Sequence, residues 1–335
     1  MKKQIGSIIT DFFCIYLRNE AGLSENTLKS YRDTFILYIK YLEERSVCTP
    51  RNMDLSVFTA NLVSMFLDWL ESERHSSVST RNQRLAALKT FSNYVIRKAP
   101  ENCKGCQDIL HLRVKRAPSA MVEYIPIDIV ASILNQPDYA TLQGIRDLAI
   151  LSFMYETGCR VQELIDTCLG DISFRKPNTV KLTGKGRKTR IIPISSNVAD
   201  IIRQYVERYK INQPDQQLFT NRSQKPLSRS GVAYILKKHL QLAKQVDSTI
   251  YIKSIHPHVF RHSKAMHLLE SGVNLIYIRD FLGHSSVTTT EIYAKCNPEL
   301  KRKYIIEAGE QLENSILPYS DNEKDELLEW LKNNI

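Results

Sequence analysis

The chain has 335 residues, of which 43% are hydrophobic and 24% are charged, proportions that are typical of globular proteins. A chain of this length usually divides its hydrophobic core between two domains. No apolar run approaches the roughly 20 residues of a bilayer-spanning helix, which excludes an integral membrane protein and predicts a soluble one. Lysine and arginine (46) outnumber aspartate and glutamate (36), and the formal charge of +10 favours a polyanionic partner, although a solvated basic face would give the same excess.

The seven cysteines, an odd number, are scattered along a chain without a secretory signal, which indicates reduced thiols and a cytoplasmic protein. The N-terminal segment begins with positive charge, but Asp11 interrupts its short apolar stretch, so we interpret it as the start of a helix. Cys103 and Cys106 have the spacing of half a zinc site. No second cysteine pair or suitably spaced histidine pair accompanies them, and we therefore expect no metal.

Residues 1–100 predict a bundle of four helices, because apolar residues recur there at helical spacing and strand-like alternation is absent. The segment Ser24-Glu-Asn-Thr supplies an N-cap for the second helix. Residues 55–70 predict the third helix, and Ser79 with Thr80 is expected to cap the fourth.

The fourth predicted helix carries basic residues away from its apolar side. They are Arg81, Arg84 and Lys89. Two interpretations stay open for them: contact with DNA phosphates, or a solvated basic face. Residues 101–120, where periodicity fades, predict a basic linker that includes a further candidate DNA contact, Lys115.

Residues 121–310 predict a second domain, again mainly helical. Within it, residues 180–183 and 189–194 are short β-rich runs around a glycine-bearing basic turn, the pattern of a β-hairpin. Residues 311–335 predict a tail with a short helix around Trp330, whose apolar residues need a partner surface. The expected fold class is therefore mainly α: an N-terminal helical bundle and a helical domain with a small hairpin.

Four local patterns follow one another in the second domain. They are Thr157-Gly-Cys-Arg160-Val-Gln-Glu163-Leu, the turn Gly184-Lys185-Gly, the run from His258-Val-Phe-Arg261 to Leu282-Gly-His284, and Thr289-Thr-Glu-Ile-Tyr293. Together and in this order they resemble the phage integrase or tyrosine recombinase family. The resemblance is strongest between residues 120 and 305, and the first hundred residues look like the family's core-binding domain. It implies a clamp around duplex DNA, formed by the two domains.

The resemblance implies that Arg160 and Arg261 hold the phosphate to be cut and that Tyr293 attacks it. Breaking a phosphodiester adds negative charge to the non-bridging oxygens, and a guanidinium offers a rigid, always-charged fork that matches two of them. A phenol ordinarily has a pKa of about 10, so nearby cations ease the loss of its proton as it attacks. The chain has 16 tyrosines, and its sequence context singles out Tyr293.

The remaining motif residues receive supporting roles from the resemblance. His258 and His284 match the two histidine positions that donate hydrogen bonds to the phosphate and assist proton movement. His262, directly after the second arginine, is expected to be a structural residue that orients its neighbours. Glu163 is expected to support Arg160 without reacting.

Lys185, at the tip of the predicted hairpin, corresponds to the general acid that protonates the departing 5′ oxygen of deoxyribose. Lys181, Arg187 and Lys188 lie close enough in sequence to compete for this role. We also expect Arg187 and Lys188 to contact DNA.

The resemblance further implies a homotetramer on two inverted-repeat sites of double-stranded DNA, exchanging strands through a 3′-phosphotyrosine and a Holliday junction. Accessory recombinases or DNA-bending proteins are possible partners. No cofactor is expected, because the phosphotyrosine retains the energy of the broken bond, and the sequence has no phosphate-binding loop. The helix around Trp330 is expected either to dock on a neighbouring protomer or to fold back on its own domain.

Several functions remain open. We favour integration, excision or transposition of a mobile element, with chromosome dimer resolution of the Xer type as the alternative. A type IB topoisomerase uses a comparable set of residues but reseals the same strand, so recombinant products would distinguish the two. A non-catalytic DNA-binding protein with the same fold is less compatible with the complete set of motif residues.

Overall fold

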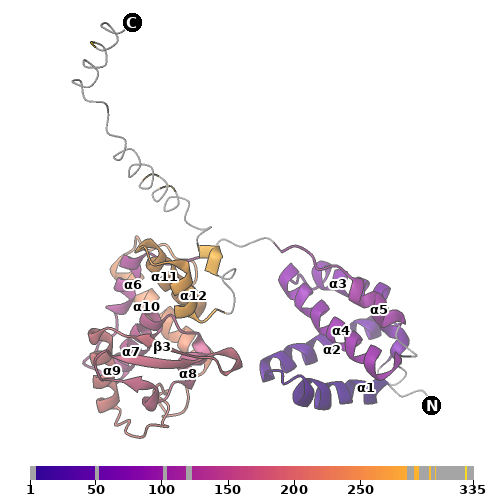
Figure 1. Ribbon diagram of the computed structural model, residues 1–335, viewed down its shortest axis with the longest axis horizontal. Coiled ribbons are helices and arrows are strands. Elements are labelled where there is room, and N and C mark those ends of the chain that lie inside the picture. Colours follow the sequence, from indigo (N-terminus) through magenta and orange to yellow (C-terminus); the bar gives the residue numbers. More distant parts are fainter. Residues whose placement is uncertain are drawn as a thin grey trace. The chain divides into compact units, whose positions relative to one another are not determined.

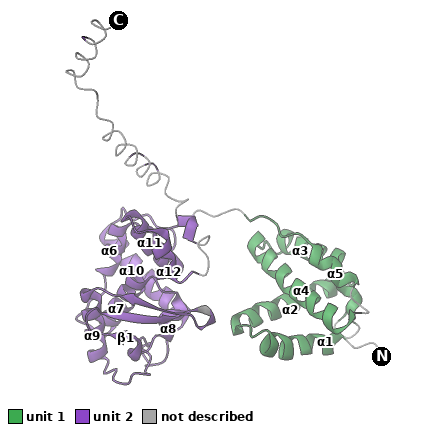
Figure 2. Cartoon of the chain, in the orientation of Figure 1, with its two compact units in different colours: residues 1–120 green, residues 121–335 purple. Residues whose placement is uncertain are grey.

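The computed structural model describes residues 5–49, 53–100, 104–117, 123–284 and 290–293, together with Arg302, Ile306 and Glu329. The chain divides into two compact units, residues 1–120 and 121–335 (Figure 2). The expected fold class is confirmed, because both units are mainly helical and the second contains a small antiparallel sheet. Among the described residues, no helix is both long enough and apolar enough to span a membrane.

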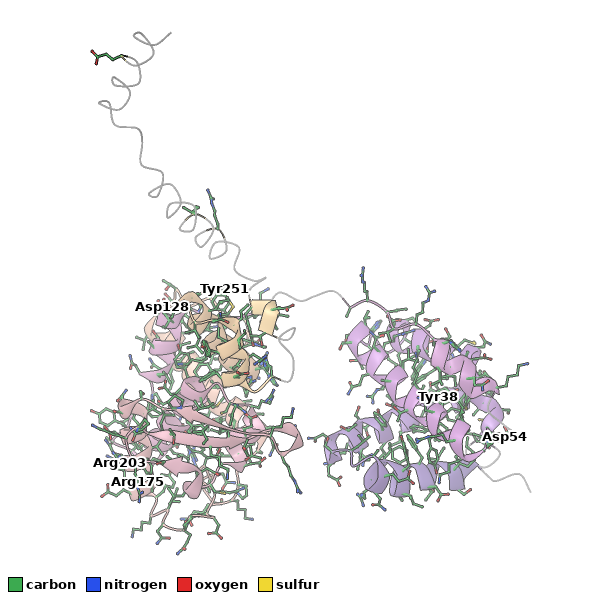
Figure 3. The ribbon with its side chains drawn as sticks, viewed as in Figure 1. Tyr38, Asp54, Asp128, Arg175, Arg203 and Tyr251 are labelled. Carbon is green, nitrogen blue, oxygen red and sulfur yellow. The ribbon has the colours of Figure 1, made fainter. Side chains whose placement is uncertain are left out.

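Unit 1 is a helical bundle (Figure 1). Its elements are α1 (Ile5–Asp11), the π-helix η1 (Phe12–Glu20), α2 (Glu25–Glu44), the 3₁₀ turn η2 (Leu55–Val57), α3 (Ala60–Ser72), α4 (Val78–Lys98) and α5 (Lys104–His111). Aromatic rings fill its core, with Phe58 and Phe91 at a centroid distance of 4.8 Å. Tyr38, labelled inside the bundle in Figure 3, donates a hydrogen bond to the carbonyl of Val57 at 2.6 Å.

Helix starts in unit 1 follow the capping chemistry, with two corrections to the predicted positions. As predicted, the Ser24 hydroxyl accepts a hydrogen bond from the first turn of α2. The prediction of one helix over residues 55–70 is wrong, because η2 is a separate turn and Thr59 caps α3. The predicted cap of α4 at Ser79 and Thr80 is also wrong. Ser77 has the extended backbone of a cap and accepts from the Thr80 amide.

Helix α5 lies within residues 101–120, the segment predicted to be a linker. It packs against α4 and buries Cys106 and Ile109 in the core of unit 1. The described residues up to His111 therefore belong to this unit. Cys103, the other half of the possible zinc pair, lies outside the described residues.

Unit 2 surrounds the buried helix α7. Its helices are α6 (Ile127–Leu134), α7 (Leu142–Thr157), α8 (Val161–Asp166), α9 (Ser196–Arg208), α10 (Arg229–Val246), α11 (Pro257–Glu270) and α12 (Leu275–Leu282). The short 3₁₀ turns are η4 (Leu169–Asp171) and η5 (Lys185–Arg187). In Figure 1, α11 and α12 lie together at one end of the unit, and α8, α9 and the sheet lie at the other.

The predicted hairpin is present as two strands of a three-stranded antiparallel sheet. The strands are β1 (Ile172–Ser173), β2 (Thr179–Thr183) and β3 (Thr189–Pro193), in the order β1-β2-β3. Val180 pairs with Ile192, and both are buried. Their neighbours Lys181 and Ile191, also paired, point to the opposite, exposed face because side chains alternate along a strand. The tail helix around Trp330 lies outside the described residues.

Candidate active site

Arg160 stands at the junction of α7 and α8, where the chain turns sharply. Gly158 ends α7 in the left-handed conformation, with φ of +53°. A Cβ atom there would lie 3.1 Å from the ring of Phe281, so the close packing of α12 also favours glycine. Arg160 is then the N-cap of α8, and its backbone N–H donates to Glu163 Oε2 at 2.8 Å. The Thr157-Gly-Cys-Arg160 motif is thus a helix end followed directly by a helix start.

Three arginines converge on the C-terminal end of α12. Its consecutive carbonyls accept from Arg190 Nε at Phe281 (2.9 Å), from Arg261 Nη2 at Leu282 (2.6 Å) and from Arg160 Nη2 at Gly283 (3.3 Å). These carbonyls have no partner within the helix, and the negative end of its dipole favours cations there. Gly283, at φ of +65°, leaves room for this arrangement, because a Cβ atom would lie 2.9 Å from Arg190 Nη1.

Glu163 joins two of these arginines. Its Oε1 accepts from Arg160 Nη1 and from Arg190 Nη1, both at 3.0 Å, and its Oε2 accepts from Arg190 Nη2 at 2.8 Å. Burial alone would raise the pKa of this carboxyl, but the hydrogen bonds from Arg190 and from the Arg160 backbone outweigh burial and lower the pKa to about 2. Glu163 is therefore a carboxylate at any physiological pH. Gly184 of the hairpin approaches it so closely that a Cβ atom would lie 2.8 Å from Oε1.

Arg190 was not among the residues predicted for the site. The signal lay in strand alternation, because Arg190 faces the same side of β3 as the buried Ile192. A cation on an inward face requires an acidic partner, and Glu163 supplies it. Arg190 therefore ties the hairpin to α8 and α12.

Arg261 has a different environment from the other two arginines. Its side chain comes from α11 and is only 4% exposed, and Nη1 donates to the Gly158 carbonyl at 2.6 Å. Burial and the charge of Arg160 lower its pKa to about 10, so it remains a cation. Within the described part of the chain it forms no ion pair with a carboxylate, and its hydrogen bonds go to backbone carbonyls. The site thus contains an excess of buried positive charge.

Two of the predicted histidines border this positive charge. His258, in the first turn of α11, is exposed, and its pKa is lowered by partial burial and by His256 and Arg261. His284 follows α12, and its Nδ1 lies 3.0 Å from Thr290 Oγ1. Burial, followed by the charges of Arg261 and Arg160, lowers the pKa of His284 to about 4. Both rings are therefore neutral near pH 7 in the absence of an anion.

Tyr293 is completely buried among apolar side chains of α11 and α12. Its hydroxyl lies 2.8 Å from Nδ1 of His262. His262, which was expected to orient its neighbours, is therefore in direct contact with the predicted nucleophile. Arg261 also lies close enough to Tyr293 for their charges to interact. The structure thus brings together Arg160, Arg261, His258, His284 and Tyr293, which are more than 130 residues apart at the extremes.

The hairpin tip forms the turn η5, which begins at Lys185. Gly186 and Arg187 both have positive φ, at 75° and 58°. Arg187 and Lys188 are exposed. The side chain of Lys185, the predicted general acid, lies outside the described part of the molecule. Its role stays a prediction.

The basic residues predicted to contact DNA from unit 1 have partners within that unit. Arg81 Nη1 donates to the Arg113 carbonyl (3.2 Å), Arg84 Nη1 to the Ser30 carbonyl (2.8 Å) and Lys89 Nζ to the Leu110 carbonyl (2.7 Å). Arg81 is buried, and the exposed Lys115 pairs with Glu71. The contacts of Arg81, Lys89 and Lys115 fasten the segment after α4 to the bundle, and the contact of Arg84 joins α4 to α2. Contact of these residues with DNA stays a prediction.

The described residues contain no cluster of three or more histidine, cysteine, aspartate or glutamate side chains arranged to hold a metal ion. The site consists instead of cationic and neutral hydrogen-bond donors around a phenol. Such a set is suited to an anion with several oxygens.

Comparisons with known proteins show what the chain is similar to. Residues 123–299 match the phage integrase family, and residues 10–99 match the phage integrase N-terminal SAM-like domain. A Sinorhizobium fredii protein named as an integrase/recombinase, y4rC, is 33% identical over 298 residues, which are 89% of each chain. The tyrosine recombinase XerD of Halalkalibacterium halodurans is 32% identical over 286 residues, 84% of this chain and 90% of the relative. A lambda integrase dimer bound to a COC′ core site shares the fold, with a TM-score of 0.64 at 14% identity over 89% of this chain and 79% of that chain.

Proposed function

Because the chain belongs to the phage integrase family of tyrosine recombinases, which are DNA strand-transferring enzymes, we propose that Arg160 and Arg261 hold a DNA phosphate for attack by Tyr293. The observation that carries this proposal is the excess positive charge at the end of α12. Arg160 and Arg190 share one carboxylate, Glu163, whereas the buried Arg261 forms no ion pair with a carboxylate among the residues that the structure describes. A phosphodiester anion would supply the missing negative charge.

The charge distribution also supports transition-state stabilisation. As Tyr293 attacks, a further negative charge develops on the phosphoryl oxygens, and the guanidiniums are already fixed by backbone carbonyls. Little reorganisation is then required during the reaction. A bound phosphate would also favour the protonated forms of His258 and His284, whose pKa values are lowered by burial and by the nearby arginines. Protonated, each ring becomes a stronger donor to the phosphoryl oxygens.

The proposed reaction proceeds in two transfers. The Tyr293 oxygen bonds to phosphorus while the bond to the 5′ oxygen breaks, and Lys185 gives that oxygen a proton. The 3′-phosphotyrosine then reacts with the 5′-hydroxyl of another strand, which reverses these steps. The bonds broken and formed are of the same kind, so the exchange requires no cofactor.

We propose that the substrate is double-stranded DNA carrying paired inverted recombination sites, on which four copies of the chain assemble and exchange strands through a Holliday junction. The biological role that we favour is the movement of a mobile element, which agrees with the name of the y4rC relative. Chromosome dimer resolution is the second candidate, because an XerD protein is almost equally similar. We expect the two roles to differ in the accessory recombinases or DNA-bending proteins that the reaction requires.

Covalent capture tests the proposed chemistry. Wild-type protein and Tyr293→Phe are incubated with fragmented genomic DNA of the source organism, the mixture is denatured, and DNA that remains attached is sequenced. We expect adducts with wild type alone, clustered at a paired inverted sequence. Equal attachment to Tyr293→Phe would show that another residue is the nucleophile. DNA binding without adducts for both proteins would contradict the catalytic proposal.

A further inference from the structure

We propose that His262 is itself a catalytic residue, and that its Nδ1 accepts the proton of Tyr293 as the tyrosine attacks phosphorus. This inference rests on the proposed function, because it assigns the proton acceptor for the same nucleophile. The attacking phenol must lose a proton, and none of the arginines that surround the phosphate can accept it.

The geometry places His262 at the reacting atom. Its Nδ1 lies 2.8 Å from the Tyr293 hydroxyl, within the reach that proton transfer requires. The ring centroids are 5.6 Å apart and the ring planes meet at 57°, so the contact is made through the ring nitrogen and the hydroxyl rather than by face-to-face stacking. His262 directly follows Arg261 on α11. One turn of helix thus carries both a phosphate anchor and the proton acceptor.

The ionisation of His262 is compatible with this role. Burial, followed by the charges of His258, Arg261 and His256, lowers its pKa to about 4. The ring is therefore neutral near pH 7, and a neutral imidazole with its hydrogen on Nε2 leaves Nδ1 free to accept from the phenol. The positive charge of Arg261 disfavours protonation of His262, and a phosphate held by Arg261 would offset that charge. The basicity of His262 should therefore rise when the substrate binds.

The other histidines of the site are oriented toward different partners. His284 Nδ1 faces Thr290, and His258 is exposed at the start of α11. Both remain available to the phosphoryl oxygens. In this proposal, His258 and His284 donate hydrogen bonds to the phosphate, and His262 accepts the proton of Tyr293.

The proton movements balance in both directions. During cleavage, the Tyr293 oxygen bonds to phosphorus as its proton passes to His262 Nδ1, and Lys185 protonates the departing 5′ oxygen. During rejoining, the attacking 5′-hydroxyl returns a proton to Lys185. The Tyr293 oxygen leaves phosphorus and recovers its proton from the His262 imidazolium.

The chain offers a matched control for a test by substitution. His267 lies on the same helix, is buried where His262 is partly buried, and places its Nδ1 2.8 Å from the hydroxyl of Tyr155. The variants His262→Asn and His267→Asn therefore remove equivalent histidine–tyrosine contacts from α11. Asparagine keeps a hydrogen-bond acceptor close to the position of Nδ1 but cannot take up a proton at neutral pH.

The experiment measures single-turnover adduct formation from pH 5 to pH 9 on a nicked duplex that carries the site recovered by covalent capture. DNA binding and thermal unfolding are recorded for each variant, with His262→Gln as a second replacement. We expect His262→Asn to bind DNA normally but to form adducts about 10² to 10³ times more slowly at pH 7. Its rate should increase about tenfold per pH unit, because hydroxide must remove the proton, whereas the wild-type rate should reach a plateau. His267→Asn should keep the wild-type rate and profile.

Two results would overturn the inference. If folded, DNA-binding His262→Asn forms adducts at the wild-type rate with the same pH profile, His262 only orients the tyrosine. If it forms adducts faster, the contact restrains Tyr293 in the unbound protein. Both results would leave the proposed function intact, since wild type still forms the adduct. Failure of wild type to form any adduct would instead reject the proposed function, and the inference with it.

Discussion

Among the described residues of unit 2, two carboxylates are buried beside basic side chains, those of Asp147 and Glu163, and the two clusters differ in one respect. Asp147, on α7, is fully buried and is contacted by Arg146, Lys238 and His239 at 2.7, 3.1 and 3.0 Å. Burial would raise its pKa, but hydrogen bonds from His239 and Arg146 lower it to about 2. Glu163 reaches the same value in the same way.

The difference lies in where the cations direct their hydrogen bonds. Around Asp147, each of the three basic side chains contacts the carboxylate itself. Around Glu163, Arg160 and Arg190 do so, but Arg261 donates to backbone carbonyls. A buried carboxylate with charged donors is therefore not a sign of function by itself. The proposal that the second cluster binds an anion rests on the neighbouring Arg261, which pairs with no carboxylate among the described residues.

Replacing the structural carboxylate should have the largest effect on stability. Asp147→Asn leaves Arg146 buried without its counter-ion, so we expect the free energy of unfolding to fall by about 3 to 5 kcal/mol. Urea unfolding at pH 7 measures this loss. Adduct formation per folded molecule should remain at the wild-type level. A stable but inactive Asp147→Asn variant would show that the two clusters are coupled.

Replacing Arg261, the proposed phosphate anchor, should reduce adduct formation more than stability. Arg261→Lys keeps the positive charge but loses the fork that contacts two carbonyls and is proposed to hold the phosphate. We expect adduct formation to fall about 10² to 10³-fold, with a smaller change in unfolding free energy than in Asp147→Asn. Single-turnover capture beside urea unfolding separates the two effects. If Arg261→Lys forms adducts at the wild-type rate, a positive charge at this position is sufficient and the guanidinium fork is not required.

The pH dependence of stability should reveal the lowered pKa values of Asp147 and Glu163. The pKa of Glu163 is lowered from an ordinary 4.5 to about 2 by its partners, so its ion pairs contribute fully above pH 4.5 and are lost as pH falls through 2. The maximum contribution is about 3 kcal/mol. Unfolding free energies between pH 7 and pH 2 should therefore fall less steeply in Glu163→Gln than in wild type. Identical slopes would mean that the pKa of Glu163 is not lowered in the folded protein.

Much of the fold was accessible from the sequence because its signals are local. The cap at Ser24, the alternation of the hairpin and the order of the motif residues each depend on neighbours along the chain. The roles of Arg81 and Lys89 were not accessible in this way. Their partners, the carbonyls of Arg113 and Leu110, lie beyond helix α4 and follow no side-chain pattern.

The same limit applied within the site. Arg190 could be noticed as a charge on an inward-facing strand position, but its three hydrogen bonds to Glu163 and Phe281 depend on how β3, α8 and α12 meet. His262 shows the effect most clearly. Its place after Arg261 says nothing about a tyrosine 31 residues away, and only the packing of the segment at Tyr293 against α11 brings them together.

The sequence by itself indicated the kind of chemistry. Two arginines, a lysine, two histidines and a tyrosine follow one another in an order that resembles the family, and such motifs depend only on the order of residues along the chain. The tertiary structure decided which charges are neutralised and which remain. It placed three arginines on the consecutive carbonyls of Phe281, Leu282 and Gly283 where α12 ends. Two of these arginines pair with Glu163, and Arg261 has no acidic partner among the described residues. The physical reason is that charge balance in a buried site depends on distances across the fold, which no local pattern encodes.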